Sequence, residues 1–104
     1  MADSERQTGG EVQEKSRPKT RQPTLYSVIL HNDDYTTMQF VLQVLESVFH
    51  KSPAEAFRIM MHVHTRGSGL CGAYPYEVAE TKVSMVHAEA QAQGFPLRAS
   101  MEEA

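Results

Sequence analysis

The sequence predicts a single α/β (α+β) domain in which three helices cover a three-stranded, mainly antiparallel sheet. Three short strand-like runs alternate with three amphipathic segments in the order strand, helix, helix, strand, helix, strand (β-α-α-β-α-β). The connections between these segments are too short to hold a further element. A chain of 104 residues is long enough for one modest core and too short for two.

The N-terminal part of the chain differs in composition from the rest, and we expect residues 1–23 to form a disordered extension. Its apolar residues are Met1, Ala2 and Val12, too few to offset the entropy lost on ordering. It carries five Lys/Arg against four Asp/Glu, whereas residues 24–104 carry five against nine. The predicted organisation is therefore a disordered tail followed by one folded domain, 24–104.

The first strand and the first helix are predicted on either side of a polar cluster. The run "LYSVIL", residues 25–30, is rich in β-branched and aromatic residues and short enough for a buried strand. Thr36 followed by Gln39 has the form of a capping box, so we expect Thr36 to begin the helix. The segment "MQFVLQVLESVFH" then places apolar residues on one helical face, at Met38, Val41, Leu42, Leu45 and Phe49.

The second helix has a stronger start signal than the first. Ser52, Pro53 and Glu55 combine a hydroxyl cap, a proline at the first helical position and a glutamate at the third. We expect this helix to continue to about Thr65 and to end at Gly67. The glycine-rich "GSGLCGAY" then predicts a turn into the second strand.

The third helix is predicted to start after Pro75 and to stop at Gly94. Its apolar stripe consists of Tyr76, Ala79, Val83, Val86 and Ala90. The segment "LRASM", which follows Pro96, is expected to supply the third strand.

Composition argues against several classes of protein. There is no run of 18 apolar residues and no signal-peptide pattern at the N-terminus, so we expect a soluble, cytoplasmic protein with no membrane partner. A net charge of −3 argues against nucleic acid as a partner. The single cysteine, Cys71, is expected to behave as a small apolar residue, since nothing nearby supplies the electropositive setting of a reactive thiol.

The residues that could carry chemistry lie in two places. Asn32, Asp33 and Asp34 follow the first strand, where the simplest interpretation is a turn or a helix cap. On the second helix, Met60, Val63 and His64 share one face, and the alternative for His64 is a satisfied core histidine. Together, acceptor groups beside methionine and valine suit a ligand that is cationic at one end and apolar next to it, such as a free α-ammonium followed by a bulky side chain.

A catalytic or metal site is a weaker interpretation of the same residues. The Asp/His pair has no serine or cysteine in a matching position, and there is no phosphate loop or nucleophile elbow, so we expect no enzyme and no cofactor. A metal-dependent enzyme would need His62, His64, Asp33 and Asp34 to converge. His62 and His64 point to nearly opposite sides of a helix, which is poor spacing for one metal, so we expect no metal site.

Four segments of the chain, in their order and spacing, resemble the ClpS family. They are "YSVILHNDDYTTMQFV", "MMHVHTRGSGLCG", "YEVAETKVSMV" and "FPLRASMEEA", and the resemblance covers essentially everything from Leu25 to Ala104. It implies an adaptor of the bacterial N-end rule pathway. Such an adaptor binds the N-terminal Leu, Phe, Tyr or Trp of a protein, its N-degron, and delivers that protein to the AAA+ unfoldase ClpA for degradation by ClpP.

The resemblance also implies roles for residues in the recognition site. Asn32, Asp34 and His64 would contact the substrate α-amino group, and Asp33 would help to hold the peptide backbone just beyond it. The position of Met38 implies a gate that disfavours β-branched side chains. The pocket for the N-terminal side chain would consist of Leu30, Thr36, Met38, Val41, Met60, Val63 and Leu97.

Outside the recognition site, the resemblance places Glu77 and Lys82 on the surface that docks to the unfoldase, and it implies that the N-terminal extension enters the unfoldase. The chain departs from the family pattern at Thr37, where many relatives have proline, and at the start of the third helix. His31 replaces a usually aliphatic residue, and we expect it at the pocket edge, where it would alter preference among the four side chains.

One alternative from another class remains. A purely structural interaction module, similar to the C-terminal domain of the ribosomal stalk, would explain the helix-on-sheet build. It would leave the cluster of acceptor groups without a purpose.

Overall fold

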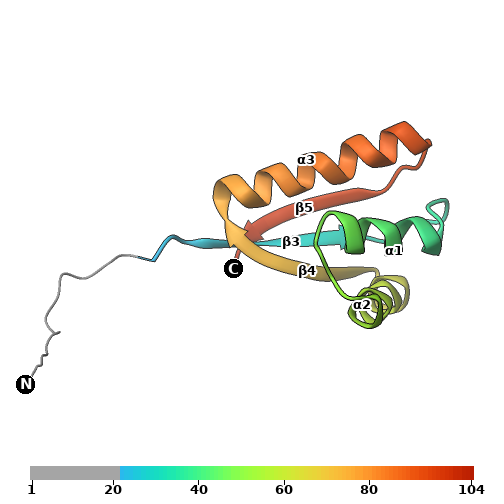
Figure 1. Ribbon diagram of the computed structural model, residues 1–104, viewed down its shortest axis with the longest axis horizontal. Helices are drawn as coiled ribbons and strands as arrows, with labels where there is room; N and C mark the ends of the chain where they lie inside the picture. The colour runs from blue at the N-terminus through green and yellow to red at the C-terminus, as the bar shows by residue number, and fades with distance from the viewer. Residues whose placement is uncertain (1–21) are drawn as a thin grey trace, which may run out of the picture.

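The computed structural model of the chain describes residues 22–104, which form three strands and three helices in the predicted order (Figure 1). The predicted disordered extension, 1–23, lies outside the described residues apart from its last two. No helix within 22–104 is long and apolar enough to cross a membrane. The elements are β3 (Leu25–His31), α1 (Met38–Ser47), α2 (Pro53–Arg66), β4 (Ser68–Pro75), α3 (Tyr76–Gln93) and β5 (Arg98–Glu103).

The sheet is antiparallel throughout, with β3 in the centre between β4 and β5. The pairing of β3 with β4 shifts by one residue, because Val28 faces Gly72 while Ile29 faces Leu70. Cys71 is therefore the extra residue of a β-bulge. Its side chain is only 1% exposed, which confirms that it behaves as a small apolar core residue.

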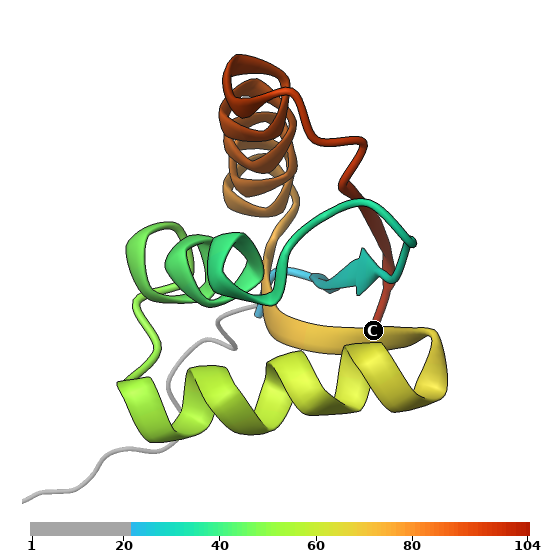
Figure 2. The same cartoon turned by 90° about the vertical axis from the view of Figure 1, so that its right-hand side faces the viewer.

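The helices enclose the core on one side of the sheet. Figure 2 shows α1 and α3 on the same side of the sheet, with α2 running below β4. α2 packs against α1 and β4, and α3 packs against all three strands. The largest fully buried side chains come from β3, β4, α3, and α1 with the residue that follows it: Leu30, Leu45, Val28, Val44, Val48, Val86 and Cys71.

The helix ends follow the sequence signals with one exception. Ser52 accepts a hydrogen bond from the Glu55 N–H at 3.2 Å, and α2 ends at Gly67, whose φ of 93° is left-handed. The prediction that Thr36 begins α1 was wrong by one residue. Thr37 is the N-cap and accepts from the Phe40 N–H at 3.1 Å, because the Thr36 hydroxyl is already used in a hydrogen bond to the preceding loop.

Lys82 joins α3 to the end of α1. Its Nζ donates a hydrogen bond to the Val48 carbonyl at 2.8 Å, where α1 has just ended. The same ammonium lies 5.2 Å from the ring centroid of Tyr74 and 5.8 Å from that of Phe49, within the range of cation–π attraction. Lys82 thus provides a hydrogen-bond donor to one of the free carbonyls at a helix C-terminus, and its positive charge is also favourable there.

The close contact of α2 with β4 depends on Gly69. A Cβ at this position would lie 2.7 Å from Cγ2 of Val63. We predict that Gly69→Ala lowers the unfolding free energy by about 1–3 kcal/mol, the usual cost of overpacking. Thermal unfolding measures the change, and Ala73→Ser, on the exposed part of the same strand, is the matched control with little expected effect. A Gly69→Ala protein as stable as the wild type would show that α2 moves away from β4 at no cost.

Candidate functional site

A cavity of about 210 Å³ lies where the loop that follows β3 meets α1 and α2. Figure 2 shows this loop arching from the end of β3 to the start of α1, above α2. We call it the β3–α1 cavity. Water occupies about 30 Å³ per molecule in the liquid, so the cavity has room for one bulky side chain rather than a folded segment. Its lining consists of Asn32, Asp33, Asp34, Thr36, Met38, Val41, Met60, Val63 and His64.

Two residues predicted for the pocket do not line this cavity. Leu30 is 0% exposed and Leu97 is 3% exposed, and both belong to the hydrophobic core. The other residues predicted for the two halves of the site are brought together from the loop, α1 and α2.

The polar rim is held in place by the backbone of the loop. The Asn32 N–H donates to the Gly67 carbonyl at 2.9 Å, which ties the start of the loop to the end of α2. Asp33 accepts three hydrogen bonds: from the N–H of Tyr35 at 2.8 Å, from the N–H of Thr36 at 2.7 Å and from the Thr36 hydroxyl at 2.7 Å. The carboxylate of Asp33 therefore acts as a turn residue, which is the simplest interpretation of its place in the sequence.

The charge state of Asp33 follows from these bonds. Partial burial acts to raise the pKa of its carboxyl group, but the hydrogen bonds from the Thr36 hydroxyl, the Thr36 N–H and the Tyr35 N–H outweigh it. The pKa is lowered from the ordinary value of 3.8. Asp33 is thus a stable anion whose oxygens are already engaged in holding the loop.

The remaining polar groups of the rim are exposed acceptors. Within residues 22–104, no hydrogen bond or ion pair engages the side chain of Asn32, Asp34 or His64. All three side chains are exposed on the rim of the cavity. An amide oxygen, a carboxylate and a neutral imidazole can together accept hydrogen bonds from a group that has several donors.

Below this rim the cavity is apolar. Val41, Met60 and Val63 are 7%, 3% and 2% exposed, and they form a buried floor. Met38 is the first residue of α1 and is 46% exposed, so it stands at the mouth of the cavity instead of in the core. Methionine side chains adapt their shape to what they contact, which suits a pocket that accepts more than one apolar group.

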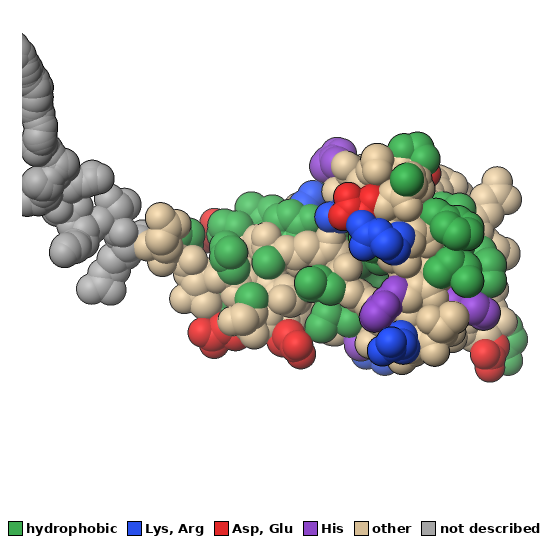
Figure 3. All heavy atoms as spheres, turned by 90° about the horizontal axis from the view of Figure 1, so that it is seen from below, with side chains coloured by type: hydrophobic (Ala, Val, Ile, Leu, Met, Phe, Trp, Pro, Cys, Tyr) green, Lys and Arg blue, Asp and Glu red, His purple; other side chains and the backbone are tan. Residues whose placement is uncertain are grey.

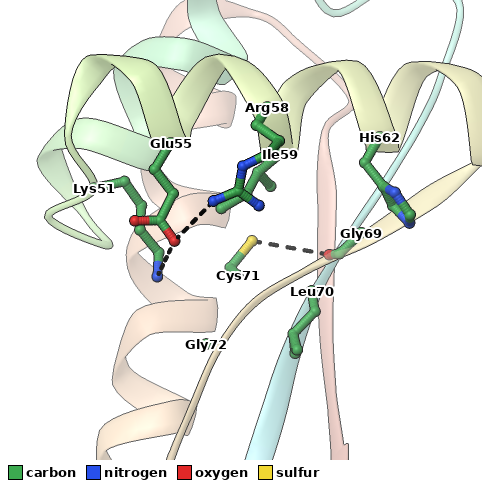
Figure 4. A pocket seen from close by; sticks show the side chains of 9 residues that line it. All are labelled: Lys51, Glu55, Arg58, Ile59, His62, Gly69, Leu70, Cys71 and Gly72. Carbon is green, nitrogen blue, oxygen red and sulfur yellow. Dashed lines mark hydrogen bonds and ion pairs between the residues drawn. The ribbon is translucent and has the colours of Figure 1, made fainter.

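His62 lies in a different hollow from His64. The α2–β4 hollow, drawn in Figure 4, is lined by His62 together with Lys51, Glu55, Arg58 and the β4 segment that contains Cys71. On the face seen in Figure 3, basic, acidic and histidine side chains lie close together. Glu55 pairs there with Arg58 at 3.4 Å and with Lys51 at 3.9 Å.

The groups needed for the alternative chemistries do not converge in the described part of the chain. Between residues 22 and 104, no three His, Cys, Asp or Glu side chains are placed to hold a metal ion. Burial raises the pKa of the Cys71 thiol to about 12, with smaller opposing effects from the Leu30 backbone and Lys51. That thiol is protonated and unreactive near neutral pH.

The resemblance placed His31 at the edge of the pocket, but His31 is not among the residues that line the β3–α1 cavity. It lines a second hollow of about 510 Å³, which we call the β5 hollow. Strand alternation explains the difference, because Leu30 points into the core and the next side chain must point to the other face. The residues lining the β5 hollow are His31, Asn32, Asp33, Asp34, Tyr35, Pro96 and Arg98.

The two residues expected to dock an unfoldase lie far from the cavity in the fold. Glu77 is exposed in the first turn of α3. Figure 1 shows that α3 starts at the opposite end of β3 from the loop that borders the cavity. Lys82, on the same helix, is engaged with Val48 and two aromatic rings as described above.

Comparison with known proteins assigns the chain to a family. The ClpS family model, described as ATP-dependent Clp protease adaptor protein ClpS, matches residues 21–100. The ATP-dependent Clp protease adapter protein ClpS of Desulfatibacillum aliphaticivorans is 57% identical over 93 residues, 89% of each chain. That of Oleidesulfovibrio alaskensis is 50% identical over 103 residues, 99% of each chain.

A solved structure agrees with both the sequence and the fold. The structure of Agrobacterium tumefaciens ClpS2 bound to L-phenylalaninamide matches with a TM-score of 0.77 and 38% sequence identity. The match covers 80% of this chain and 100% of the ClpS2 chain. The chain therefore belongs to the ClpS family of adaptors of the ATP-dependent Clp protease.

Proposed function

We propose that this adaptor binds the N-terminal Leu, Phe, Tyr or Trp of a substrate protein and delivers that protein to a ClpA-type AAA+ unfoldase for degradation by ClpP. The observation that carries the proposal is the combination of unpaired acceptors at the rim of the β3–α1 cavity with a buried apolar floor. A purely structural module of the ribosomal-stalk kind would leave these acceptors without a ligand.

The rim suits a free α-ammonium group. An ammonium has three donors and no acceptor, so its site must consist of acceptors. Asn32, Asp34 and His64 provide three, from two segments that the hydrogen bond between Asn32 and Gly67 holds together. The carboxylate of Asp34 also supplies the opposite charge, which strengthens each hydrogen bond at the ammonium.

The floor suits the first side chain, and neither half suffices alone. Burying a leucine or phenylalanine side chain contributes about 1.5–3 kcal/mol, which gives weak affinity and cannot distinguish a terminus from an internal residue. Hydrogen bonds to a charged group contribute about 1.5–3 kcal/mol each and supply that distinction. Met38 at the mouth of the cavity would act as the gate against β-branched side chains.

The ligand of the Agrobacterium relative supports this division of the site. L-Phenylalaninamide has a free ammonium and a benzyl side chain, and its amide replaces the carboxylate that a free amino acid would carry. It therefore has the chemistry of the first residue of a protein chain. In the β3–α1 cavity, the ammonium of such a residue would lie at the rim and its side chain on the apolar floor.

For the unfoldase we propose a contact centred on Glu77, at the start of α3. Its carboxylate is exposed, so it is available to a partner. Lys82 would contribute mainly by fixing α3 against the end of α1, since its ammonium is already bonded to the Val48 carbonyl. The N-terminal extension would enter the unfoldase during delivery.

Acetylation of the substrate amine tests the proposed function directly. It removes the charge and two of the three donors, so a peptide that begins with acetyl-Phe should bind at least roughly 100-fold more weakly than one that begins with Phe. Fluorescence anisotropy with a labelled peptide measures the affinity, and a Gly-initiated peptide controls for the apolar half. Equal affinity of the acetylated and free peptides would contradict the proposal.

Substitutions of the two neighbouring aspartates should differ in their effects on peptide affinity and on stability. Asp34→Ala removes a charged acceptor at the rim, so peptide affinity should fall about 10- to 100-fold while the melting temperature stays close to that of the wild type. Asp33→Ala should have the smaller effect on affinity and the larger effect on stability, with about 0.5–2 kcal/mol lost as for a helix cap. The reverse ranking of the two affinities would mean that the carboxylates are assigned wrongly.

The contribution of Asp33 to stability should also depend on pH. Its pKa in the folded protein is below the ordinary 3.8, so the stabilisation is complete above that pH and is lost as the pH falls through the lowered value. The difference in melting temperature between the wild type and Asp33→Ala should therefore shrink below about pH 4.

Peptide affinity should depend on the acceptor that His64 places at the rim. His64→Ala removes this acceptor and should weaken binding, whereas His64→Gln keeps an acceptor and should bind more tightly than His64→Ala. His62→Ala, in the α2–β4 hollow, is the matched control and should leave peptide affinity unchanged. Equal affinities of His64→Ala and the wild type would remove His64 from the amine site.

A further inference from the structure

We propose that the β5 hollow receives the side chain of the second substrate residue, and that Arg98 makes this adaptor favour an acidic residue there. The inference rests on the proposed function, because it assumes that the first residue occupies the β3–α1 cavity. It assigns a specificity role to Arg98, which does not line that cavity.

The two hollows border the same loop. Asn32, Asp33 and Asp34 line both of them. α1 and α2 contribute to the β3–α1 cavity alone, whereas the end of β3 and the start of β5 contribute to the β5 hollow alone. A substrate whose amine is held at Asn32 and Asp34 thus begins at the boundary between the hollows. An extended chain advances about 3.3–3.6 Å per residue, so its second residue is still beside this loop.

The directions of the side chains also place the first and second substrate residues in different hollows. Successive side chains of an extended chain point to opposite sides. If the first side chain enters the β3–α1 cavity, the second is directed away from it. The β5 hollow, with a volume of about 510 Å³, lies beyond the loop and can take a long polar side chain.

The positive charge of the β5 hollow comes from Arg98, on its strand side. His31 and Arg98 are directly opposite each other across β3 and β5, so their side chains stand on the same face of the sheet. The ring of His31 is fixed by a hydrogen bond of 2.6 Å between its Nε2 and Oγ of Ser100. Arg98 is exposed, and both ion pairs among residues 22–104 are made by Glu55, so Arg98 has no carboxylate partner in that part of the chain.

The two carboxylates on the loop side have their oxygens bound to other groups when a substrate is present. The Asp33 carboxylate accepts three hydrogen bonds from Tyr35 and Thr36. Asp34 would face the substrate ammonium. Asp33 keeps its charge, but its oxygens are held by these bonds inside the loop. Arg98 then carries the permanent positive charge of the β5 hollow, and its guanidinium can pair with a carboxylate of the second residue in a bidentate manner.

Three peptides that differ only in the second residue test the inference. They begin Phe-Glu, Phe-Gln and Phe-Lys and continue with the same neutral sequence, and their dissociation constants are measured by fluorescence anisotropy at low ionic strength. We expect the ratio of the Phe-Lys constant to the Phe-Glu constant to exceed 1. Arg98→Gln should lower this ratio about two- to fivefold, the scale of an exposed ion pair.

The controls separate this inference from the proposed function. Arg58→Gln removes an exposed arginine of the α2–β4 hollow and should leave the ratio unchanged. The Phe-Gln constant should be the same in Arg98→Gln and the wild type, which also shows that the variant is folded. In the wild type the ratio should fall toward 1 at about 0.5 M salt, because exposed charges are then screened within a few ångströms.

Two results would overturn the inference while the proposed function stands. One is a wild-type ratio at or below 1 with all three peptides bound, and the other is a ratio that Arg98→Gln does not change. If none of the three peptides binds in preference to its acetylated form, the proposed function fails and the inference fails with it.

Discussion

The recognition site depends on how the loop between β3 and α1 is held. Its cavity is assembled from a loop and two helices that are separate in the sequence. A small movement of the loop would therefore separate Asn32 and Asp34 from His64 and from the apolar floor. The hydrogen bond from Asn32 to Gly67 ties one end of the loop to α2. The bonds to Asp33 close the turn that leads into α1. Asp33 thus holds the loop through these hydrogen bonds, while the next residue, Asp34, is exposed at the rim of the cavity.

The order of the elements and most of their ends could be predicted from the sequence because local chemistry sets them. Ser52 with Pro53 begins α2, and glycines with left-handed φ angles end α2 and α3. The start of α1 lies one residue later than predicted because two neighbouring threonines can both cap a helix. Asp33, three residues before Thr36, engages the Thr36 hydroxyl and leaves Thr37 as the cap. The bond from Lys82 to Val48 spans 34 residues and has no local signal at all.

The candidate site could be predicted in part. The features that depend on helix spacing were predictable, whereas those that depend on hydrogen bonding in the folded loop were not. The spacing of Met60, Val63 and His64 on a helix predicts a shared face, and all three line the cavity. Two adjacent aspartates look equivalent in the sequence, although one proves to be a structural acceptor and the other an exposed one. His31 was expected beside the first cavity, but it follows Leu30, which faces the core, so strand alternation directs its side chain to the other hollow.

Cys71 has a practical consequence for the chemistry of the whole domain. It is the single cysteine of the chain, it is almost completely buried at the bulge of β4, and burial raises the pKa of its thiol to about 12. The reactive thiolate form is therefore scarce at the pH of maleimide labelling. A cysteine introduced on the surface, for example beside the β5 hollow, would take up a fluorophore selectively while the native thiol stays unmodified. The same protection makes the folded domain insensitive to mild oxidants that act on thiolates.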